Sequence, residues 1–89
     1  MHILFVCTGN ICRSPRAERL AVMNASRLQI RGFRATSAGV RAVRGHPIHP
    51  VAAQILKGLG AHSTDFVARQ VTSKMVLESD LTVTMTRGH

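Results

Sequence analysis

The chain has 89 residues, of which 45% are hydrophobic and 18% charged, with three Phe and no Trp or Tyr. This balance is typical of one small globular domain with a thin aliphatic core, and it excludes a disordered chain. Twelve Lys and Arg against four Asp and Glu give a net charge of +8, which favours anionic partners such as phosphoesters. The basic residues form no run and have no aromatic residues between them, so nucleic acid is disfavoured as the main partner.

The N-terminal residues do not have the features of a signal peptide. The apolar run over residues 3–6 is short and follows no basic region, and no segment reaches the roughly 20 apolar residues that span a bilayer. A disulfide between Cys7 and Cys12 would close a very short loop and add little stability. These features predict a cytoplasmic protein with reduced thiols and no membrane association.

The first third of the chain predicts a strand, a loop, a helix and a second strand. Residues 3–6 are a continuous apolar run of β-formers, as in a central strand buried on both faces of a parallel sheet. Ser14 is expected to cap the helix and Pro15 to lie in its first turn, with apolar residues at helical spacing up to a stop near Gly32. The second strand is expected over residues 33–37.

The rest of the chain alternates turn-forming residues with apolar stretches. The expected elements are a loop over residues 39–50, a helix that starts at Pro50 and ends before Gly60, and an irregular stretch over 61–71. A short helix capped by Thr72 or Ser73 and running through Glu78, and a strand over 81–85, follow. Met75, Val76 and Leu77 of the short helix are expected in the core. This order predicts a small three-layer, doubly wound α/β domain over residues 1–89, with three parallel strands and flanking helices.

The loop between the first strand and the first helix carries the residue types that phosphate chemistry needs. It reads Cys7-Thr8-Gly9-Asn10-Ile11-Cys12-Arg13-Ser14-Pro15, and residues Thr8 to Arg13 are the expected phosphate-binding segment. Backbone amides that turn into a helix N-terminus form an anion nest, and Gly9 and Asn10 tolerate the left-handed conformations it requires. Arg13 can clamp two phosphate oxygens, while Cys7 faces the same amides and is expected to be a thiolate nucleophile.

An alternative reading makes Cys7 a small buried apolar residue and Arg13 a solvated charge. The spacing of these two residues alone would not exclude it. The complete string between a buried strand and a Ser-Pro helix start favours the phosphate site. Metal binding by His46, His49 and His62 is disfavoured, because the Pro-rich loop has no clustered carboxylate or thiol.

With Val6 in front of it, this string resembles the signature of the low-molecular-weight protein tyrosine phosphatases. Further segments in the family's order are Thr36-Ser37-Ala38-Gly39, Gly45-His46-Pro47, Ala68-Arg69-Gln70-Val71 and the run from Ser79 to Thr86. The resemblance covers essentially the whole chain. It implies hydrolysis of phosphomonoesters through a phosphocysteine, in which Cys7 attacks phosphorus, Arg13 binds the phosphoryl oxygens and Ser14 hydrogen-bonds the sulfur.

The resemblance also implies supporting roles and substrates. Asn10 would hold the shape of the loop through a bond toward Ser37, and Cys12 would form a reversible disulfide with the nucleophile under oxidants. The implied substrates are a phosphotyrosine protein or a small aryl phosphate, and phosphate and other oxyanions would bind the same loop. No cofactor and no metal are implied.

The chain departs from the family pattern at the general acid. Family members are longer, and their Asp-Pro acid loop follows the part that resembles this chain, so the domain is expected to be C-terminally incomplete. The acids present are Glu18, Asp65, Glu78 and Asp80. None of them matches the family acid, so the general acid is unknown. Losing such an acid costs about 10²–10⁴ in rate, which predicts weakened hydrolysis.

Other departures leave alternatives open. A non-catalytic oxyanion-binding or regulatory module competes with the phosphatase, whereas arsenate reductase is disfavoured because no cysteine follows Cys12. Arg41 and Arg44 lie where an aromatic residue often lines the phosphotyrosine cleft, and they could favour acidic flanking residues instead. The strand over 81–85 would be an exposed apolar edge that invites a homodimer.

Overall fold

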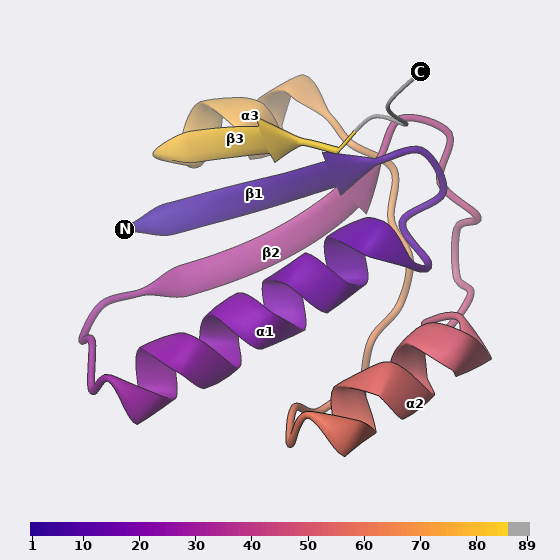
Figure 1. Ribbon diagram of the computed structural model, residues 1–89. Helices are drawn as coiled ribbons and strands as arrows, with labels where there is room; N and C mark the ends of the chain where they lie inside the picture. The colour runs from indigo at the N-terminus through magenta and orange to yellow at the C-terminus, as the bar shows by residue number, and fades with distance from the viewer. Residues whose placement is uncertain (86–89) are drawn as a thin grey trace.

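The computed structural model describes residues 1–85 of the chain (Figure 1). Three parallel strands and three helices make up the described fold, which confirms the expected α/β class. In chain order the elements are β1 (His2–Cys7), α1 (Arg13–Arg27), β2 (Arg34–Gly39), α2 (Pro50–Gly58), α3 (Ser73–Glu78) and β3 (Leu81–Thr84). Thr72 is the N-cap of α3, as predicted, and its side chain accepts a hydrogen bond from the backbone N–H of Met75.

The sheet has the strand order β2-β1-β3, so β1 is the central strand, as its continuous apolar run predicted. In the parallel register, Cys7 of β1 lies opposite Gly39 of β2, and Val6 lies opposite Thr84 of β3. The carboxyl ends of all three strands therefore meet at one edge of the sheet. In open α/β sheets this is the edge at which ligands bind.

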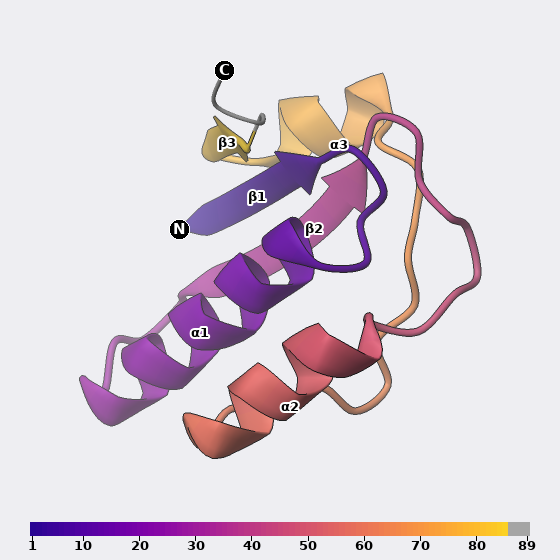
Figure 2. The ribbon, with the colours of Figure 1, turned by 45° about the vertical axis from the view of Figure 1, so that its right-hand side comes forward.

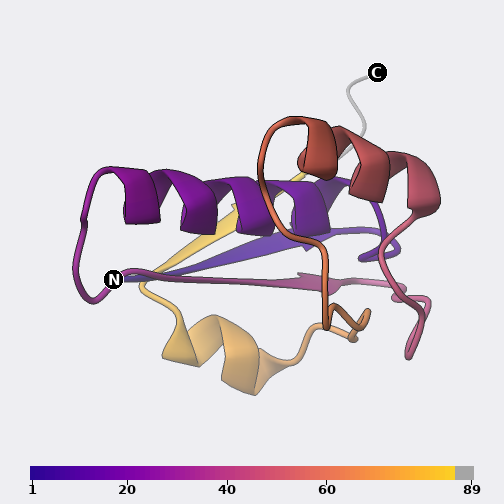
Figure 3. The ribbon, with the colours of Figure 1, turned by 90° about the horizontal axis from the view of Figure 1, so that it is seen from below.

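The helices form layers on both faces of the sheet. Seen edge-on, α1 and α2 lie on one side of the strands and α3 lies on the other (Figure 3). The second view shows α2 beside α1, with the chain after α2 returning toward the sheet (Figure 2). The predicted three-layer arrangement is therefore confirmed for the described residues.

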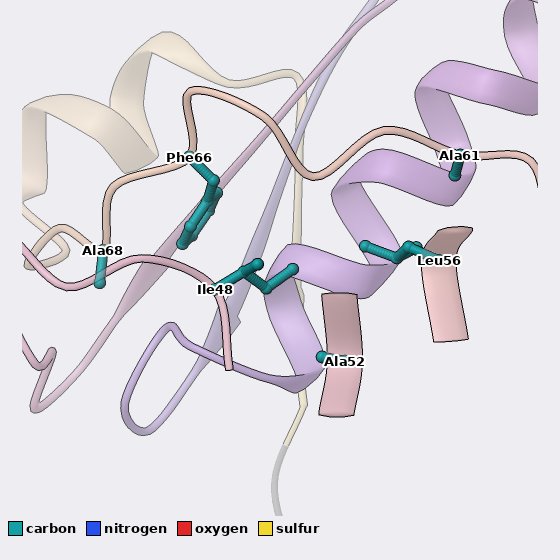
Figure 4. Close-up of a cluster of buried hydrophobic side chains, with 6 residues drawn as sticks. All are labelled: Ile48, Ala52, Leu56, Ala61, Phe66 and Ala68. Carbon is teal, nitrogen blue, oxygen red and sulfur yellow. The ribbon is translucent and has the colours of Figure 1, made fainter. Parts of the chain in front are cut away.

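Two small apolar clusters make up the core. On the side of α3, Leu4, Val6 and Ala38 are buried, and Val71 and Met75 pack against them. The second cluster joins α2 to the segments before and after it, and comprises Ile48, Ala52, Leu56, Ala61, Phe66 and Ala68 (Figure 4). Leu20 and Met23 of α1 pack against this second cluster, so α2 is fixed to α1.

The start of α1 differs from the prediction. The N-cap residue is Cys12, which makes no side-chain capping bond, and the helix begins at Arg13. Ser14 is buried inside the first turn, and its hydroxyl lies 2.9 Å from the Cys7 sulfur. The predicted cap at Ser14 is therefore wrong, because the hydroxyl is used by the loop instead of the helix end.

The end of α1 also differs, since the helix stops at Arg27, before the predicted end near Gly32. Gln29 adopts a left-handed backbone conformation with φ of 55°, and the N–H of Ile30 donates to the carbonyl of Ala25 at 2.9 Å. This geometry closes a helix by satisfying its last carbonyl groups. The apolar spacing beyond residue 27 therefore overestimated the length of the helix.

In α3, the prediction that three neighbouring apolar residues lie in the core is wrong for two of them. Met75 is partly buried, whereas Val76 and Leu77 are 42% and 84% exposed. The helix is one and a half turns long and turns only one face to the sheet, so consecutive residues cannot all be buried.

Among residues 1–85, β3 is an outer strand of the sheet, and Leu81 at its start is 48% exposed. An outer strand presents unpaired backbone groups that can pair with another chain, so the homodimer stays a prediction. Thr86, the last residue of the family-like run, lies outside the described residues. None of the helices in the described part is long and apolar enough to cross a membrane.

Candidate active site

Cys7 is the last residue of β1 and is buried at the ligand-binding edge of the sheet. Its sulfur lies 2.9 Å from the Ser14 hydroxyl and accepts a hydrogen bond of 3.2 Å from the backbone N–H of Asn10. The sulfur thus faces the start of α1 and one of the loop amides. Hydrogen-bond donors and a helix N-terminus both stabilise a negative charge on sulfur, as a phosphate-attacking cysteine requires.

Asn10 holds the loop in its curved shape. It is completely buried and has a φ of 58°, the left-handed conformation that Asn tolerates better than most residues. Its Nδ2 donates to Ser14 Oγ at 2.8 Å, and its Oδ1 accepts from the backbone N–H of Arg69 at 2.9 Å. The expected bond from Asn10 toward Ser37 is therefore wrong, because the side chain of Asn10 bonds to Ser14 and to the backbone of Arg69 instead.

These contacts determine the direction of the hydrogen bond between Ser14 and the nucleophile. Ser14 Oγ accepts from Asn10, so its single hydrogen is left to donate. The Cys7 sulfur lies 2.9 Å away, whereas the alternative acceptor, the carbonyl of Ala38, lies 3.5 Å away. A thiolate can only accept, so a deprotonated Cys7 would take this hydrogen bond from Ser14, the role that the family resemblance predicts for it.

Ser37 supports the loop indirectly, through Arg69. Its hydroxyl donates to Glu18 Oε1 at 2.8 Å, and its carbonyl accepts from Arg69 Nε at 2.9 Å. The bond to the carbonyl holds the side chain of Arg69, while the backbone of Arg69 holds Asn10. Ser37 thus acts on the loop through Arg69.

A second layer of backbone contacts lies behind the loop. The N–H groups of Val40, Arg41 and Val43 donate to the carbonyls of residues 7, 8 and 9, at 2.9, 2.9 and 3.0 Å. A side chain at Gly39 would place its Cβ only 2.5 Å from the carbonyl oxygen of Thr8. The loop is therefore packed tightly against the end of β2 and the residues that follow it.

The loop encloses a cavity of about 220 Å³ at the carboxyl edge of the sheet. It is lined by Cys7, Thr8, Gly9, Ile11, Cys12, Arg13 and Met85. The structure thus brings together the predicted nucleophile, the predicted clamp and most of the predicted phosphate-binding segment. Asn10 and Ser14 are buried behind the cavity wall.

Two residues of the site were missed from the sequence. Met85 follows β3, and the expected parallel register was sufficient to place its strand end beside the loop. Arg69 lies 59 residues from Asn10, and no local pattern predicts a contact over that separation.

No carboxylate lines the cavity, although all four acidic residues of the chain lie within its described part. Glu18 is bonded to Ser37 and pairs with Arg19 at 2.9 Å. Glu78 pairs with Lys74, and Asp80 accepts from the backbone of His2 at the opposite end of β1. Asp65 is exposed in the segment after α2. None of the four is placed to protonate a leaving group at Cys7.

The three histidines considered as metal ligands do not form a cluster. His49 is the N-cap of α2, where its Nδ1 accepts from the backbone N–H of Val51 at 3.2 Å. Residues 1–85 contain no group of three or more His, Cys, Asp or Glu side chains arranged to hold a metal ion.

Comparisons with known proteins agree with this geometry. Residues 2–89 match the family model described as low molecular weight phosphotyrosine protein phosphatase. The low molecular weight protein-tyrosine-phosphatase Etp of Escherichia coli K12 is 38% identical over 87 residues, which cover 98% of this chain and 55% of that protein. The chain spans about half the length of the curated relatives it matches.

Solved structures of phosphatases are also similar to this chain. The low molecular weight protein tyrosine phosphatase from T. tengcongensis is 37% identical with a TM-score of 0.90, over 96% of this chain and 58% of that one. The YwlE arginine phosphatase from Geobacillus stearothermophilus is 34% identical with a TM-score of 0.82, over 96% of this chain and 52% of that one.

Proposed function

This chain belongs to the low molecular weight phosphotyrosine protein phosphatase family, and from this premise we propose that it hydrolyses phosphomonoesters through a phosphocysteine intermediate. The observation that carries the proposal is the buried Cys7 sulfur, 2.9 Å from the Ser14 hydroxyl and within a loop shaped to bind an oxyanion. The proposed substrates are phosphotyrosine proteins or small aryl phosphates.

In the proposed reaction, the Cys7 thiolate attacks phosphorus and forms an S–P bond while the P–O bond to the aryl group breaks. Arg13 binds two phosphoryl oxygens and remains with them as charge shifts. Water then attacks the phosphorus of the phosphocysteine, the S–P bond breaks, and inorganic phosphate leaves. The Ser14 hydroxyl donates to the departing sulfur, so the sulfur leaves as a stabilised thiolate.

The departing phenol oxygen needs a proton unless it is a stable anion by itself. None of the carboxylates in residues 1–85 faces the cavity, so the described residues provide attack and binding without proton donation. General acid catalysis is typically worth about 10²–10⁴ in rate. We therefore propose that the chain turns over activated aryl phosphates much better than phosphotyrosine.

The test compares an activated aryl phosphate with phosphotyrosine, using wild type, Cys7→Ser and, as the control, Ser26→Ala on the exposed part of α1. Turnover of the activated ester that is lost in Cys7→Ser and retained in Ser26→Ala is the expected result. Equal Cys7-dependent turnover of both esters would refute the proposal that the described residues provide no proton donor. Phosphoarginine is included, because some structural neighbours are named arginine phosphatases, and its preferred turnover would replace the aryl substrate class.

A non-catalytic oxyanion-binding or regulatory module is the second candidate. The observation that favours it is that Cys7, Arg13 and the loop line the described cavity together, whereas none of the carboxylates of residues 1–85 does. This candidate would be established if the protein binds inorganic phosphate but turns over no ester. Mass spectrometry after an acid quench should then detect no phosphocysteine. A phosphocysteine on Cys7 would eliminate it.

The cytoplasmic location and the homodimer also stay proposals. The dimer is proposed through β3, where the exposed Leu81 lies on the outer strand of the described sheet. Sedimentation over a range of concentrations should show association that Leu81→Lys weakens, since a charge on an edge strand opposes pairing. A monomer at all concentrations would exclude this contact.

A further inference from the structure

A second basic hollow is lined by segments that support the catalytic loop. It has a volume of about 450 Å³, and its lining includes Arg44, Gly45, Ala68, Arg69, Thr72 and Met75. Residues 44–45 come from the segment between β2 and α2, and residues 68–72 form the approach to α3. Pockets that bind ligands typically have volumes of about 300–1,000 Å³, so this hollow is large enough for more than a single oxyanion.

The walls of the hollow are fixed by backbone hydrogen bonds. The N–H of Gly45 donates to the carbonyl of Ala68 at 3.0 Å, and the N–H of Ala68 donates to the carbonyl of His46 at 2.8 Å. The side chain of Arg69 is held by its Nε bond to the carbonyl of Ser37. A binding site whose walls and side chains are already ordered loses less entropy when it binds.

The charge of the hollow is not balanced by the protein's own acids. Arg44 and Arg69 both line it, and no carboxylate does. Three of the four carboxylates of the chain are bonded elsewhere, to Ser37 and Arg19, to Lys74 and to the backbone of His2, and Asp65 is absent from the lining. Two guanidinium groups that share one hollow repel each other unless an anion lies between them. The hollow is therefore complementary to an acidic ligand.

The hollow is also close to the catalytic cavity. The N–H of Val43 donates to the carbonyl of Gly9, which lines the cavity, and Arg44 is the next residue. Consecutive Cα atoms are about 3.8 Å apart, and an extended peptide advances about 3.3 Å per residue. A peptide held by a phosphorylated residue at Cys7 can therefore reach the hollow within a few residues.

We propose that this hollow binds acidic side chains that flank the phosphorylated residue of a protein substrate. The proposal rests on the proposed function, and it assigns selection of the substrate to Arg44 and Arg69. The two arginines provide the charge, and the exposed Thr72 provides a hydroxyl. The partly buried Met75 provides an apolar surface for the stem of an acidic side chain.

The test measures the binding of four fluorescent peptides to the Cys7→Ser chain, so that turnover is not needed. The first phosphotyrosine peptide has neutral flanking residues. The second has two Glu at three and four residues after the phosphotyrosine, and the third has two Glu at three and four residues before it. The fourth is the unphosphorylated form of whichever acidic peptide binds more tightly. Two exposed charge pairs, each worth up to about fivefold, should make one acidic phosphopeptide about tenfold tighter than the neutral one. Salt of about 0.5 M should remove most of this preference.

Two variants determine whether the hollow is responsible. Arg44→Gln should reduce the preference to about threefold or less, whereas Arg31→Gln should leave it unchanged. Arg31 is an exposed arginine between α1 and β2, at the opposite edge of the sheet, and its replacement removes the same charge. Equal affinity for acidic and neutral phosphopeptides, or a preference that survives Arg44→Gln, would overturn the proposal.

The design separates this inference from the proposed function. If no peptide gains affinity from its phosphate, phosphotyrosine recognition fails, and the unphosphorylated acidic peptide tests the hollow alone. Arg44-dependent binding of that peptide would then support the hollow, and its absence would overturn it. If inorganic phosphate alone competes with the unphosphorylated acidic peptide at the hollow, the ligand is a small oxyanion and the proposal of a peptide site is refuted.

Discussion

At Gly39, the last residue of β2, any side chain would collide with the backbone of the catalytic loop. A Cβ there would lie 2.5 Å from the carbonyl oxygen of Thr8, 3.0 Å from the backbone nitrogen of Asn10 and 3.1 Å from its Cβ. These atoms belong to a hydrogen-bonded loop and cannot rotate away. The Gly39→Ala variant therefore has to move the loop by about half an ångström or more, a shift that spoils binding and catalytic geometry.

Overpacking of this kind costs about 1–3 kcal/mol of the free energy of unfolding, a large part of the roughly 5–15 kcal/mol of a small domain. Urea unfolding of Gly39→Ala should show this loss, and calorimetric titration with inorganic phosphate should show binding weakened by at least about tenfold. The matched control is Gly58→Ala at the end of α2, where an added Cβ meets nothing within 4 Å. Because Ala favours helix, this control should be up to about 1 kcal/mol more stable.

The result that would refute this reasoning is a Gly39→Ala protein with wild-type stability and wild-type phosphate affinity. The close approach would then not constrain the loop. A loss of stability with unchanged phosphate affinity would show that β2 moves instead of the loop. In either case, the claim that Gly39 shapes the anion site would fail.

Three further substitutions test the site. Ser14→Ala removes the hydroxyl that would donate to the departing sulfur in the proposed reaction, and a hydrogen bond to a charged group is worth about 1.5–3 kcal/mol. Cys7-dependent turnover of an activated ester should therefore fall about 10- to 100-fold. The control Ser26→Ala, on the exposed part of α1, should change nothing. In urea unfolding, Asn10→Ala should lower the free energy of unfolding by about 2–4 kcal/mol. The loss in Asn10→Gly should be smaller by about 1 kcal/mol, because glycine adopts the φ of 58° without strain. Peroxide inactivation should be reversed by dithiothreitol in wild type but not in Cys12→Ser, because without a resolving thiol the nucleophile oxidises further; equal recovery of the two proteins would exclude this role.

The position and curvature of the loop could be predicted from sequence because they depend on local order. A strand that ends at Cys7 and a helix that begins at Arg13 force the intervening residues to turn, and a turn into a helix N-terminus exposes amides in one direction. The central position of β1 was also predictable, because a strand buried on both faces reads as a continuous apolar run. Neither conclusion requires a contact between distant residues.

Some contacts of the site could not be predicted from the sequence. They join residues that are distant in the chain, or they involve a side chain that could form either of two hydrogen bonds. The hydroxyl of Ser14 suits a helix cap and a hydrogen bond to sulfur equally well, and only the position of Asn10 decides between them. The bond between Asn10 and Arg69 joins residues 59 positions apart. The bonds that hold Ser37 to Glu18 and Arg69 depend on how α1 and the segment before α3 pack against β2.

The division of tasks among the described residues follows from where their polar groups lie. Oxyanion binding and thiolate attack require only the loop and its support, which β1, α1, β2 and residues 68–71 provide together. A proton donor for the leaving group would have to lie across the cavity from the sulfur, and Glu18, the carboxylate nearest in sequence, is bonded to Ser37 instead. Freeing Glu18 for catalysis would release that bond without bringing the carboxyl group to the cavity side of the loop. In the proposed reaction, the rate is therefore expected to depend on the leaving group, because none of the carboxylates in residues 1–85 lines the cavity.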